Sequence, residues 1–215
     1  MKTLLLSALI ATLLTFGVAA AGEQMKPLSL PQPQTTGGRP LMQVLKDRST
    51  SRSFSSEKLS PQMLSNLLWA AFGINRPDSG KRTAPSAMDR QEIDIYVAVA
   101  EGLSIYDAKA QALQPVLTAD IRAMTGRQPF VADAPVNLVY VADYGRMGKA
   151  PREDLDLYAA ADTGFISENV YLFCASEGLV TVVRGSVDRE ALAKTMKLRL
   201  DQKIILVQTI GYPKK

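Results

Sequence analysis

Apolar residues recur at helical spacing in several parts of the chain, and residues that start or stop helices bound most of these runs. The first run, Leu41 to Leu45, predicts a short helix that delivers Arg48 at its end. A second helix begins at Ser60-Pro61, an N-cap and first-turn pair in their preferred places, and stops at Gly73. Further helices are predicted over residues 118–125, 154–177 and 188–196.

Alternating apolar positions predict the strands. Apolar residues alternate from Ile93 to Val99, and Gly102 then turns the chain into a second strand that ends at Tyr106, so a hairpin is expected. Residues 75–90 are rich in turn formers without apolar periodicity and predict a long loop. Shorter runs predict strands over residues 136–142, 180–183 and 203–210. These elements indicate an α+β domain, in which helices flank an antiparallel or mixed central sheet.

The first 21 residues have the pattern of a secretory signal peptide. Lys2 precedes an uncharged apolar run from Thr3 to Val18, which ends in Ala19-Ala20-Ala21, an A-x-A-like cleavage site. We therefore expect an exported, periplasmic protein without stable insertion in a membrane. Residues 22–40 are rich in Pro, Gln, Thr and Gly and predict a flexible linker, which leaves residues 41–215 as one domain.

Composition narrows the possible chemistry. Without residues 1–21 the chain has 215 − 21 = 194 residues, enough for one domain with a core, and loss of Lys2 changes the formal charge from +4 to +3. This mild charge, without a Lys/Arg run, does not predict nucleic-acid binding. The chain has no histidine, which excludes Ser-His-Asp triads, Cys-His dyads and His-ligated zinc sites, and no metal site is predicted. Enzyme chemistry would therefore come from a bound cofactor.

The single cysteine, Cys174, lies in an apolar helical pattern and is predicted to be a buried structural thiol. Three tyrosines in the predicted strands, Tyr96, Tyr106 and Tyr140, are interpreted as core or interface aromatics. No side chain stands out as a general acid or base.

One polar stretch is a candidate binding site. Arg48-Ser49-Thr50-Ser51-Arg52-Ser53-Phe54 alternates guanidinium groups with hydroxyls directly after a predicted helix. Arginine forks and small hydroxyls are the usual donors to a phosphate group. A solvated Ser/Arg loop is the other interpretation, and this stretch alone leaves both open.

The same stretch fills every position of the opening motif of the flavin-dependent nitroreductase family, R-[RHS]-[ST]-x-[RK]-x-F. In that family the motif holds the phosphate and ribityl chain of FMN. The resemblance therefore implies that the FMN phosphate and ribityl chain are held here by Arg48, Ser49, Thr50 and Arg52.

A second segment, Arg82 to Ala87, is similar to the next signature of the family, in the R-x-x-P-S-A form of the branch that contains thiazoline and oxazoline dehydrogenases. In the family this loop lies along the flavin ring. The resemblance implies such contacts, largely through backbone groups, for Pro85, Ser86 and Ala87, and Gln91 matches the glutamine that commonly follows. Three positions depart from the pattern: Met88 replaces Gly, Asp89 replaces Asn and Glu92 replaces Pro.

Later segments extend the resemblance to nearly all of residues 41–213. Gly164 to Leu179 is similar to the long central helix of the family, and Thr181 to Gly185 lies where the family presents backbone N–H groups to flavin N5 and O4. Ile210 to Pro213 resembles the terminal signature, after which basic residues approach the phosphate. Lys214 is the candidate for that contact, with a solvated tail as the alternative.

Arg82 and Arg184 are candidates for placing positive charge near the flavin ring, where it would favour an anionic reduced flavin. The alternative for each is a surface ion pair.

The resemblance implies FMN at the interface of an intertwined homodimer. It also implies an oxidoreductase that passes two electrons, as hydride through flavin N5, from a reductant to an organic acceptor such as a nitroarene or a quinone. NAD(P)H is a candidate reductant, although nicotinamides are scarce outside the cytoplasm. The alternatives are a flavin-dependent dehydrogenase that oxidises a peptide or small molecule, a flavin- or ligand-binding module without turnover, and a purely structural secreted domain.

Overall fold

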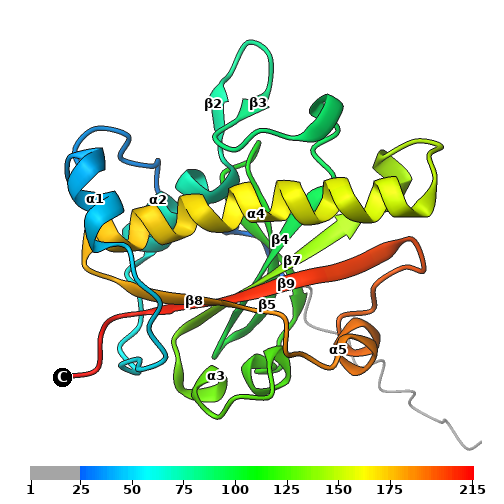
Figure 1. Ribbon diagram of the computed structural model, residues 1–215. Coiled ribbons are helices and arrows are strands. Elements are labelled where there is room, and N and C mark those ends of the chain that lie inside the picture. The colour runs from blue at the N-terminus through cyan, green and yellow to red at the C-terminus, as the bar shows by residue number, and fades with distance from the viewer. Residues whose placement is uncertain (1–24) are drawn as a thin grey trace, which may run out of the picture.

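The computed structural model describes residues 25–215 (Figure 1), so the predicted signal peptide, residues 1–21, lies outside the described residues. The longest elements are α2 (Pro61–Phe72), β4 (Ile93–Val99), β7 (Val136–Asp143), α4 (Arg152–Glu177) and β9 (Gln202–Gly211). The shorter elements are β1 (Leu28–Ser29), α1 (Leu41–Asp47), β2 (Ile74–Arg76), β3 (Lys81–Arg82), η1 (Ala87–Asp89), β5 (Gly102–Asp107), β6 (Ala112–Leu117), η2 (Arg122–Thr125), α3 (Phe130–Asp133), η3 (Tyr144–Arg146), β8 (Val180–Arg184) and α5 (Arg189–Thr195).

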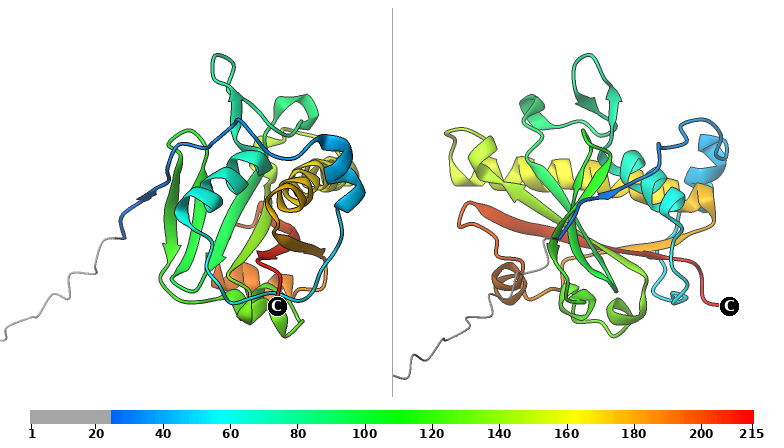
Figure 2. Two further views of the ribbon diagram at one scale, coloured as in Figure 1. Left: turned by 90° about the vertical axis from the view of Figure 1, so that its left-hand side faces the viewer. Right: turned by 180° about the vertical axis from the view of Figure 1, so that it is seen from behind.

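Seven strands form one antiparallel sheet in the order β1-β6-β5-β4-β7-β9-β8. The predicted β4–β5 hairpin is present, with Val99 opposite Gly102 at its turn. β7 and β9 are neighbours in the sheet although α4 and β8 separate them along the chain. β8 is an edge strand, because it pairs only with β9. The predicted fold class is confirmed, since helices lie against a central antiparallel sheet (Figure 2).

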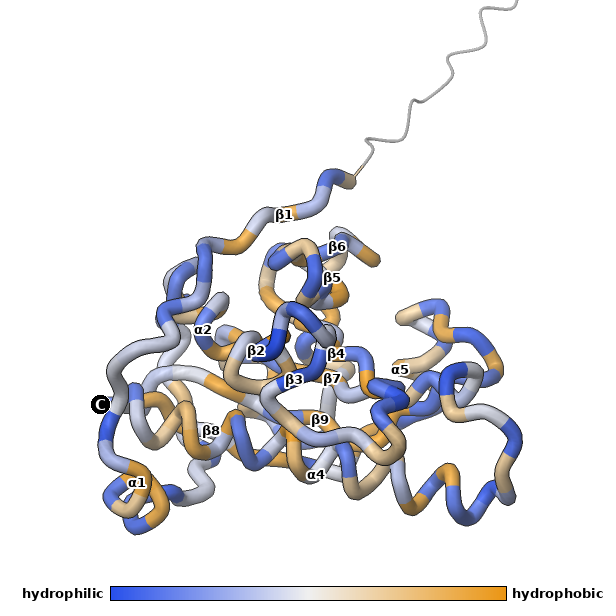
Figure 3. Tube along the Cα trace, turned by 90° about the horizontal axis from the view of Figure 1, so that it is seen from above, coloured by the Kyte–Doolittle hydropathy of each residue, from blue (hydrophilic) through white to orange (hydrophobic). Residues whose placement is uncertain are grey.

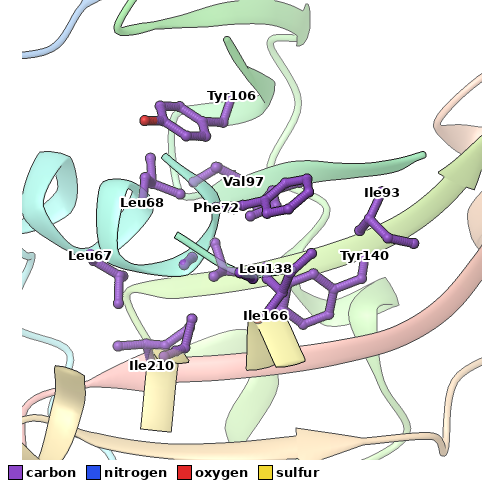
Figure 4. Close-up of a cluster of buried hydrophobic side chains, with 14 of the residues drawn as sticks. Leu67, Leu68, Phe72, Ile93, Val97, Tyr106, Leu138, Tyr140, Ile166 and Ile210 are labelled. Atoms are coloured by element: carbon purple, nitrogen blue, oxygen red, sulfur yellow. The ribbon is translucent and has the colours of Figure 1, made fainter. Parts of the chain in front are cut away.

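Helices α2 and α4 cover one face of the sheet. The Ser60 hydroxyl caps α2 as predicted by accepting a hydrogen bond from Met63 N at 3.1 Å. The core beneath these helices is made by Leu67, Leu68 and Phe72 of α2, Ile166 of α4, and Val97, Leu138 and Tyr140 of the strands (Figure 4). Cys174 of α4 joins this core at 1% exposure, so the prediction of a buried structural thiol is confirmed. No helix in the described part of the chain is both long and apolar enough to cross a membrane.

Helix α5 covers the opposite face. Its Leu192 packs with Val139 and Val141 of β7 and with Val207 of β9. Because successive strand residues point to opposite sides of a sheet, β7 supplies Leu138 and Tyr140 to one core and their neighbours to the other. This two-sided burial explains why β7 is apolar almost throughout.

The structure differs from the prediction between residues 107 and 125. A strand that the periodicity did not predict, β6, pairs with β5 over five residues, and its far side pairs only with the two-residue β1. Pro115, which has no N–H, is tolerated on such a peripheral strand. The predicted helix over residues 118–125 is wrong, because only Arg122–Thr125 forms a 3₁₀ turn. The Asp120 carboxylate accepts a hydrogen bond from Arg122 N at 3.0 Å, so the turn begins at Arg122 and not at residue 118.

The predicted loop over residues 75–90 is largely irregular, but it contains the small β2–β3 hairpin. This hairpin stands above α4 in Figure 1, and Figure 3 shows that it is strongly hydrophilic. These two strands were missed by sequence reasoning because they are too short to show alternating apolar residues. Turn residues form the tip between them and end at Gly80, whose φ is +66°.

The prediction of a flexible linker over residues 22–40 is wrong for the described part, residues 25–40. Leu28 and Ser29 pair with β6, and Leu30 is 7% exposed within the core. Further along, the Arg39 guanidinium donates to the main-chain carbonyl of Ala175 near the end of α4. The composition suggested a free tether because one buried leucine and a two-residue strand carry no periodic signal.

Candidate functional site

The Arg48–Phe54 stretch runs beside the free edge of strand β8. Helix α1 delivers Arg48 as predicted, and Arg48 N still donates to Val44 O at 2.8 Å. Ser51 N then donates to Thr181 O of β8 at 3.1 Å, which fixes the stretch to the edge strand. The residues left exposed on this extended segment include Ser49, Thr50 and Arg52. Hydroxyl and guanidinium donors are therefore gathered on one solvent-facing surface.

Tyr171 of α4 ties this stretch to β8. Its hydroxyl accepts from Val183 N at 3.0 Å and lies 3.1 Å from the Thr50 hydroxyl. The Arg48 guanidinium lies over the Tyr171 ring, 5.3 Å from the centroid, in a cation–π contact. The sequence analysis did not single out Tyr171, because a tyrosine in an amphipathic helix is usually a core residue. Only the fold shows what its hydroxyl meets.

The outer edge of β8 continues toward Gly185. Alternate residues of an extended strand direct their N–H groups to the same side. Val183 N points away from β9, toward Tyr171, so alternation places the N–H of exposed Gly185 on that outer side too. The Gly185 carbonyl is already used, since Val187 N donates to it at 3.0 Å. Because β8 ends at Arg184, the backbone donor at Gly185 stays a prediction.

The C-terminal residues lie against the same stretch. Phe54 forms an antiparallel bridge with Pro213, and Ser55 N donates to Tyr212 O at 2.9 Å. A Cβ at Gly211 would lie 2.8 Å from a proline ring carbon, so the terminal signature needs glycine here for close packing. Lys214 follows directly and is exposed. Its contact with a phosphate stays a prediction.

Arg48 and Arg52 are candidates for anion binding on charge grounds as well. Within residues 25–215, no ion pair joins either guanidinium to a carboxylate. Two cations that lack a carboxylate partner, beside several hydroxyls, fit a phosphate dianion better than a structural role. The donor set of this surface therefore fits the phosphate end of FMN.

The side chain of Arg184 is buried, so the expected surface ion pair is wrong, whereas the expected positive charge near the flavin ring stays a prediction. It is 5% exposed and belongs to no ion pair of the described residues. Its guanidinium donates to Thr125 O at 2.9 Å and to the Thr209 hydroxyl at 2.7 Å, and it also reaches Asn137 and Gln128. Burial lowers the pKa of Arg184 to about 10, which leaves the group charged at neutral pH. A surface ligand can meet only its main chain.

Arg82 and Gln91 organise the second candidate loop, residues 82–92. Arg82 Nε donates to Gln91 Oε1 at 2.7 Å, Nη1 donates to Phe72 O at 2.9 Å, and the guanidinium lies 4.7 Å from the Phe72 ring centroid. Burial lowers the pKa of Arg82. Gln91 Nε2 in turn donates to Gly80 O at 3.2 Å. Both side chains therefore have a structural role within their own chain. Their predicted roles toward a ligand would come in addition to that role.

The backbone of this loop is strained at three non-glycine positions. Met88, Asp89 and Gln91 have φ values of 55°, 53° and 49°, in the left-handed region. Two of the three departures from the family pattern therefore fall where glycine or asparagine would fit more comfortably. Pro85 is exposed, and Ser86 and Ala87 are partly exposed just before the strained turn.

Two buried carboxyl groups hold the back of the loop. Ala87 N donates to Asp162 Oδ2 of α4 at 2.8 Å, and the Ser86 hydroxyl donates to Glu92 Oε2 at 3.2 Å. The Ala87 N–H is therefore already hydrogen-bonded within the chain. The predicted backbone contact with the flavin ring is left to Pro85 and Ser86. Asp162 was missed by sequence reasoning, because its contact spans 75 positions of the chain.

The two candidate clusters stand apart within one chain. Tyr171, beside the Arg48–Phe54 stretch, and Asp162, behind the 82–92 loop, are 171 − 162 = 9 residues apart on α4. At 1.5 Å per residue this is about 13 Å along the helix axis. Figure 1 shows the C-terminus beyond one end of α4, whereas the β2–β3 hairpin stands over the middle of this helix. The two candidate clusters are therefore anchored at separate points of α4.

Comparisons with known proteins show the family to which the chain belongs. The model of the Nitroreductase family matches residues 45–212. A protein of Ralstonia eutropha, provisionally named a nitroreductase, is 45% identical, and its crystal structure matches with a TM-score of 0.85 over 91% of this chain and 93% of that chain. A protein of Methanocaldococcus jannaschii with the same provisional name is 29% identical over 169 residues, 74% of this chain and 85% of its own.

A third match is the microcin synthetase McbBCD complex of E. coli, solved with truncated pro-MccB17 bound. It is 21% identical, with a TM-score of 0.68 over 95% of this chain and 85% of that chain, and at this identity it shows the fold alone. Because the family model covers most of the chain and the relatives carry the same name, the chain belongs to the nitroreductase family and is an oxidoreductase of that type.

Proposed function

We propose that the protein is an exported FMN-dependent oxidoreductase that passes two electrons, as hydride, between a reductant and an organic acceptor such as a nitroarene or a quinone. The observation that carries the proposal is the surface formed by Arg48, Thr50 and Tyr171 beside the edge of β8. When bound, FMN supplies the hydride chemistry at its N5 atom. The chain itself has to bind, orient and shield the cofactor.

The chain's own residues divide this work. Arg48 and Arg52 neutralise the phosphate, and Ser49 and Thr50 donate to it from short side chains. The N–H of Gly185 lies further along the same edge, at the position suited to a donor toward the ring. Because these groups sit on a strand edge and on a segment bonded to it, they are held in fixed geometry before a ligand arrives.

We further propose that two copies of the chain complete each site. A two-fold dimer uses the same surface on both copies, so the Arg48–Phe54 stretch of one copy can meet the 82–92 loop of the other, twice. Apolar side chains are exposed on the part of α4 that contacts the 82–92 loop. On α4, Leu157, Ala161 and Phe165 follow one another at intervals of four, and Leu157 and Phe165 are 64% and 49% exposed. In Figure 3, hydrophobic stretches recur along this helix.

Replacing Phe165 with aspartate is expected to give a monomer at concentrations where the wild-type protein is a dimer. A charge on the outer face of α4 removes apolar burial on both copies, at a cost of about 2–4 kcal/mol per copy. Sedimentation velocity measures the change, and FMN affinity should fall at least tenfold with it. Leu200→Asp is the matched control, because Leu200 is fully exposed and lies in the turn between α5 and β9, not on α4. A wild-type monomer, or a dimeric Phe165→Asp variant, contradicts the proposed dimer.

The cofactor and the direction of electron flow are tested on the exported form, residues 22–215. The absorption spectrum should show bound flavin, either as purified or after addition of FMN. Protein that stays colourless and gains no flavin absorbance with excess FMN overturns the proposal. Anaerobic mixing with NADH or NADPH should bleach the flavin rapidly if a nicotinamide is the reductant.

Two other functions would give different results in the same experiments. A dehydrogenase that oxidises a peptide or small molecule keeps its flavin colour with nicotinamides but is bleached by dithionite. The microcin synthetase complex, at 21% identity, shares the fold alone and does not favour this function over the first. A binding module without turnover shows no steady-state reduction of any nitroarene or quinone.

A further inference from the structure

Two buried carboxyl groups without a cationic partner lie behind the 82–92 loop. Glu92 is 0% exposed and Asp162 is 2% exposed. In the described part of the chain, no ion pair includes either of them. Arg146 approaches Glu92 but donates to its main-chain carbonyl, at 2.9 Å. Burying two adjacent carboxylates, both ionised and without a counterion, is strongly unfavourable.

The hydrogen bonds around the pair indicate where one proton would sit. Asp162 Oδ2 accepts from Ala87 N at 2.8 Å, as a carboxylate does. Glu92 Oε2 accepts from the Ser86 hydroxyl, whereas Glu92 Oε1 is buried and has no donor among residues 25–215. A buried carboxylate oxygen without a donor is costly. A proton on Glu92, shared with the Asp162 carboxylate, removes that cost.

We propose that Glu92 and Asp162 share one proton at neutral pH, and that this protonated pair positions Ser86 and Ala87 for the cofactor. The second part rests on the proposed function, whereas the shared proton stands on the chain alone. Glu92 acts here as a positioning residue, through Ser86. The same hydroxyl accepts from Gln91 N at 2.8 Å, so the pair fixes both ends of the strained turn.

The surrounding charges favour retention of this proton. Burial raises the pKa of Glu92 and the neighbouring Asp162 raises it further, which together outweigh the lowering by the main-chain N–H of Glu92 and the Ser86 hydroxyl. The other charged groups near the pair are neutralised by one another or directed elsewhere: Arg146 pairs with Asp94 and Asp143, Arg82 donates to Gln91, and Arg90 Nη2 meets the Met88 sulfur. No lysine or arginine side chain of the described residues pairs with the two carboxyls.

The direct test is the infrared spectrum of the protein at neutral pH, which shows a C=O stretching band for each protonated carboxyl group. The wild-type protein should show such a band, and Glu92→Gln should lack it. Glu101→Gln is the matched control, because Glu101 is exposed and its Lys58 partner lowers its pKa, so it is ionised at neutral pH. Absence of the band in the wild-type protein, or its persistence in Glu92→Gln, overturns the proposal.

Stability measurements supply the pH dependence. In the folded protein the pair binds a proton that an unfolded glutamate, with its ordinary pKa of 4.5, releases. The stability that the pair contributes is therefore greatest below that pH and falls as pH rises, by up to about tenfold in the folded-to-unfolded ratio per pH unit for one proton, until the folded protein also loses it. Glu92→Gln should lack this decline, and an unchanged decline in that variant counts against the pair. If the variant does not fold, the wild-type infrared band and its titration still decide the question.

FMN binding then tests the positioning role. The dissociation constant of FMN should rise with pH in the wild-type protein as the pair loses its proton, and this rise should be missing from Glu92→Gln, in which only the titration of the FMN phosphate remains. Identical pH profiles in the two proteins overturn the positioning role. Failure of both proteins to bind FMN at any pH overturns the proposed function and the positioning role with it, while the infrared band continues to decide the shared proton.

Discussion

Replacing Arg48 and Arg52 together with alanine is expected to weaken FMN binding by about 3–6 kcal/mol, or roughly 10²–10⁴-fold, since each arginine loses a hydrogen bond to a charged group. The fold should survive the change. Neither side chain is buried, and within residues 25–215 neither has a carboxylate partner that would be left unpaired. Titration of FMN fluorescence measures the dissociation constant.

Riboflavin, which lacks the phosphate, separates phosphate binding from every other effect. The double variant should bind riboflavin nearly as well as the wild-type protein does, because the arginines act on the phosphate. Arg199→Ala is the control variant, since Arg199 is exposed and pairs with Asp143 and Asp201. Equal losses for FMN and riboflavin, or no loss for FMN, would show that these arginines do not hold a phosphate.

The elements that sequence patterning predicted correctly are those in which local preference and burial agree. Helix α2 has a capping serine, a first-turn proline and an apolar face that packs in the core, so three independent signals mark the same segment. Burial also agrees with local pattern in β4 and β7, whose alternate residues face two cores. Long α4 was predicted within two residues at its start and ends at the predicted position.

The elements that patterning missed depend on neighbours distant in the chain. Strand β6 contains Pro115 and is stable because β5 pairs along it. The segment around Leu30 is ordered by β6 and by α2, where Ser65 donates to Pro31 O. Such pairing and burial leave no trace in local periodicity.

The candidate site divides in the same way. Motif similarity identified the Arg48–Phe54 stretch and the 82–92 loop, because their main-chain positions follow from local sequence. It did not reveal Tyr171 or Asp162, which act on these segments from α4. It also misplaced the Arg184 side chain, because a strand alternates its sides and only the fold shows which side is covered. Contacts between residues that are distant in the sequence determine these placements, and local sequence does not reveal them.

Replacing Arg184 with methionine is expected to lower the free energy of unfolding by about 3–5 kcal/mol, because it leaves several buried acceptors without a donor. Methionine fills similar space but donates nothing to Thr125 O or to the buried polar pair of Asn137 and Thr209. Gly126 leaves the space that the guanidinium needs, since a Cβ at this position would lie 1.8 Å from Arg184 Nη1. Urea unfolding followed by circular dichroism measures the loss.

Arg152→Met is the matched control, because Arg152 lies over an aromatic ring, as Arg184 does over Phe130 at 5.7 Å, but is exposed. The Arg152 guanidinium is 4.2 Å from the Tyr144 ring centroid and its side chain is 59% exposed, so the change should cost less than about 1 kcal/mol. Arg184→Lys should fall between the two, since one ammonium cannot span acceptors on three sides. Equal, small losses for Arg184→Met and Arg152→Met would mean that the buried network relaxes or admits water, and that Arg184 does not hold β8 to its neighbours.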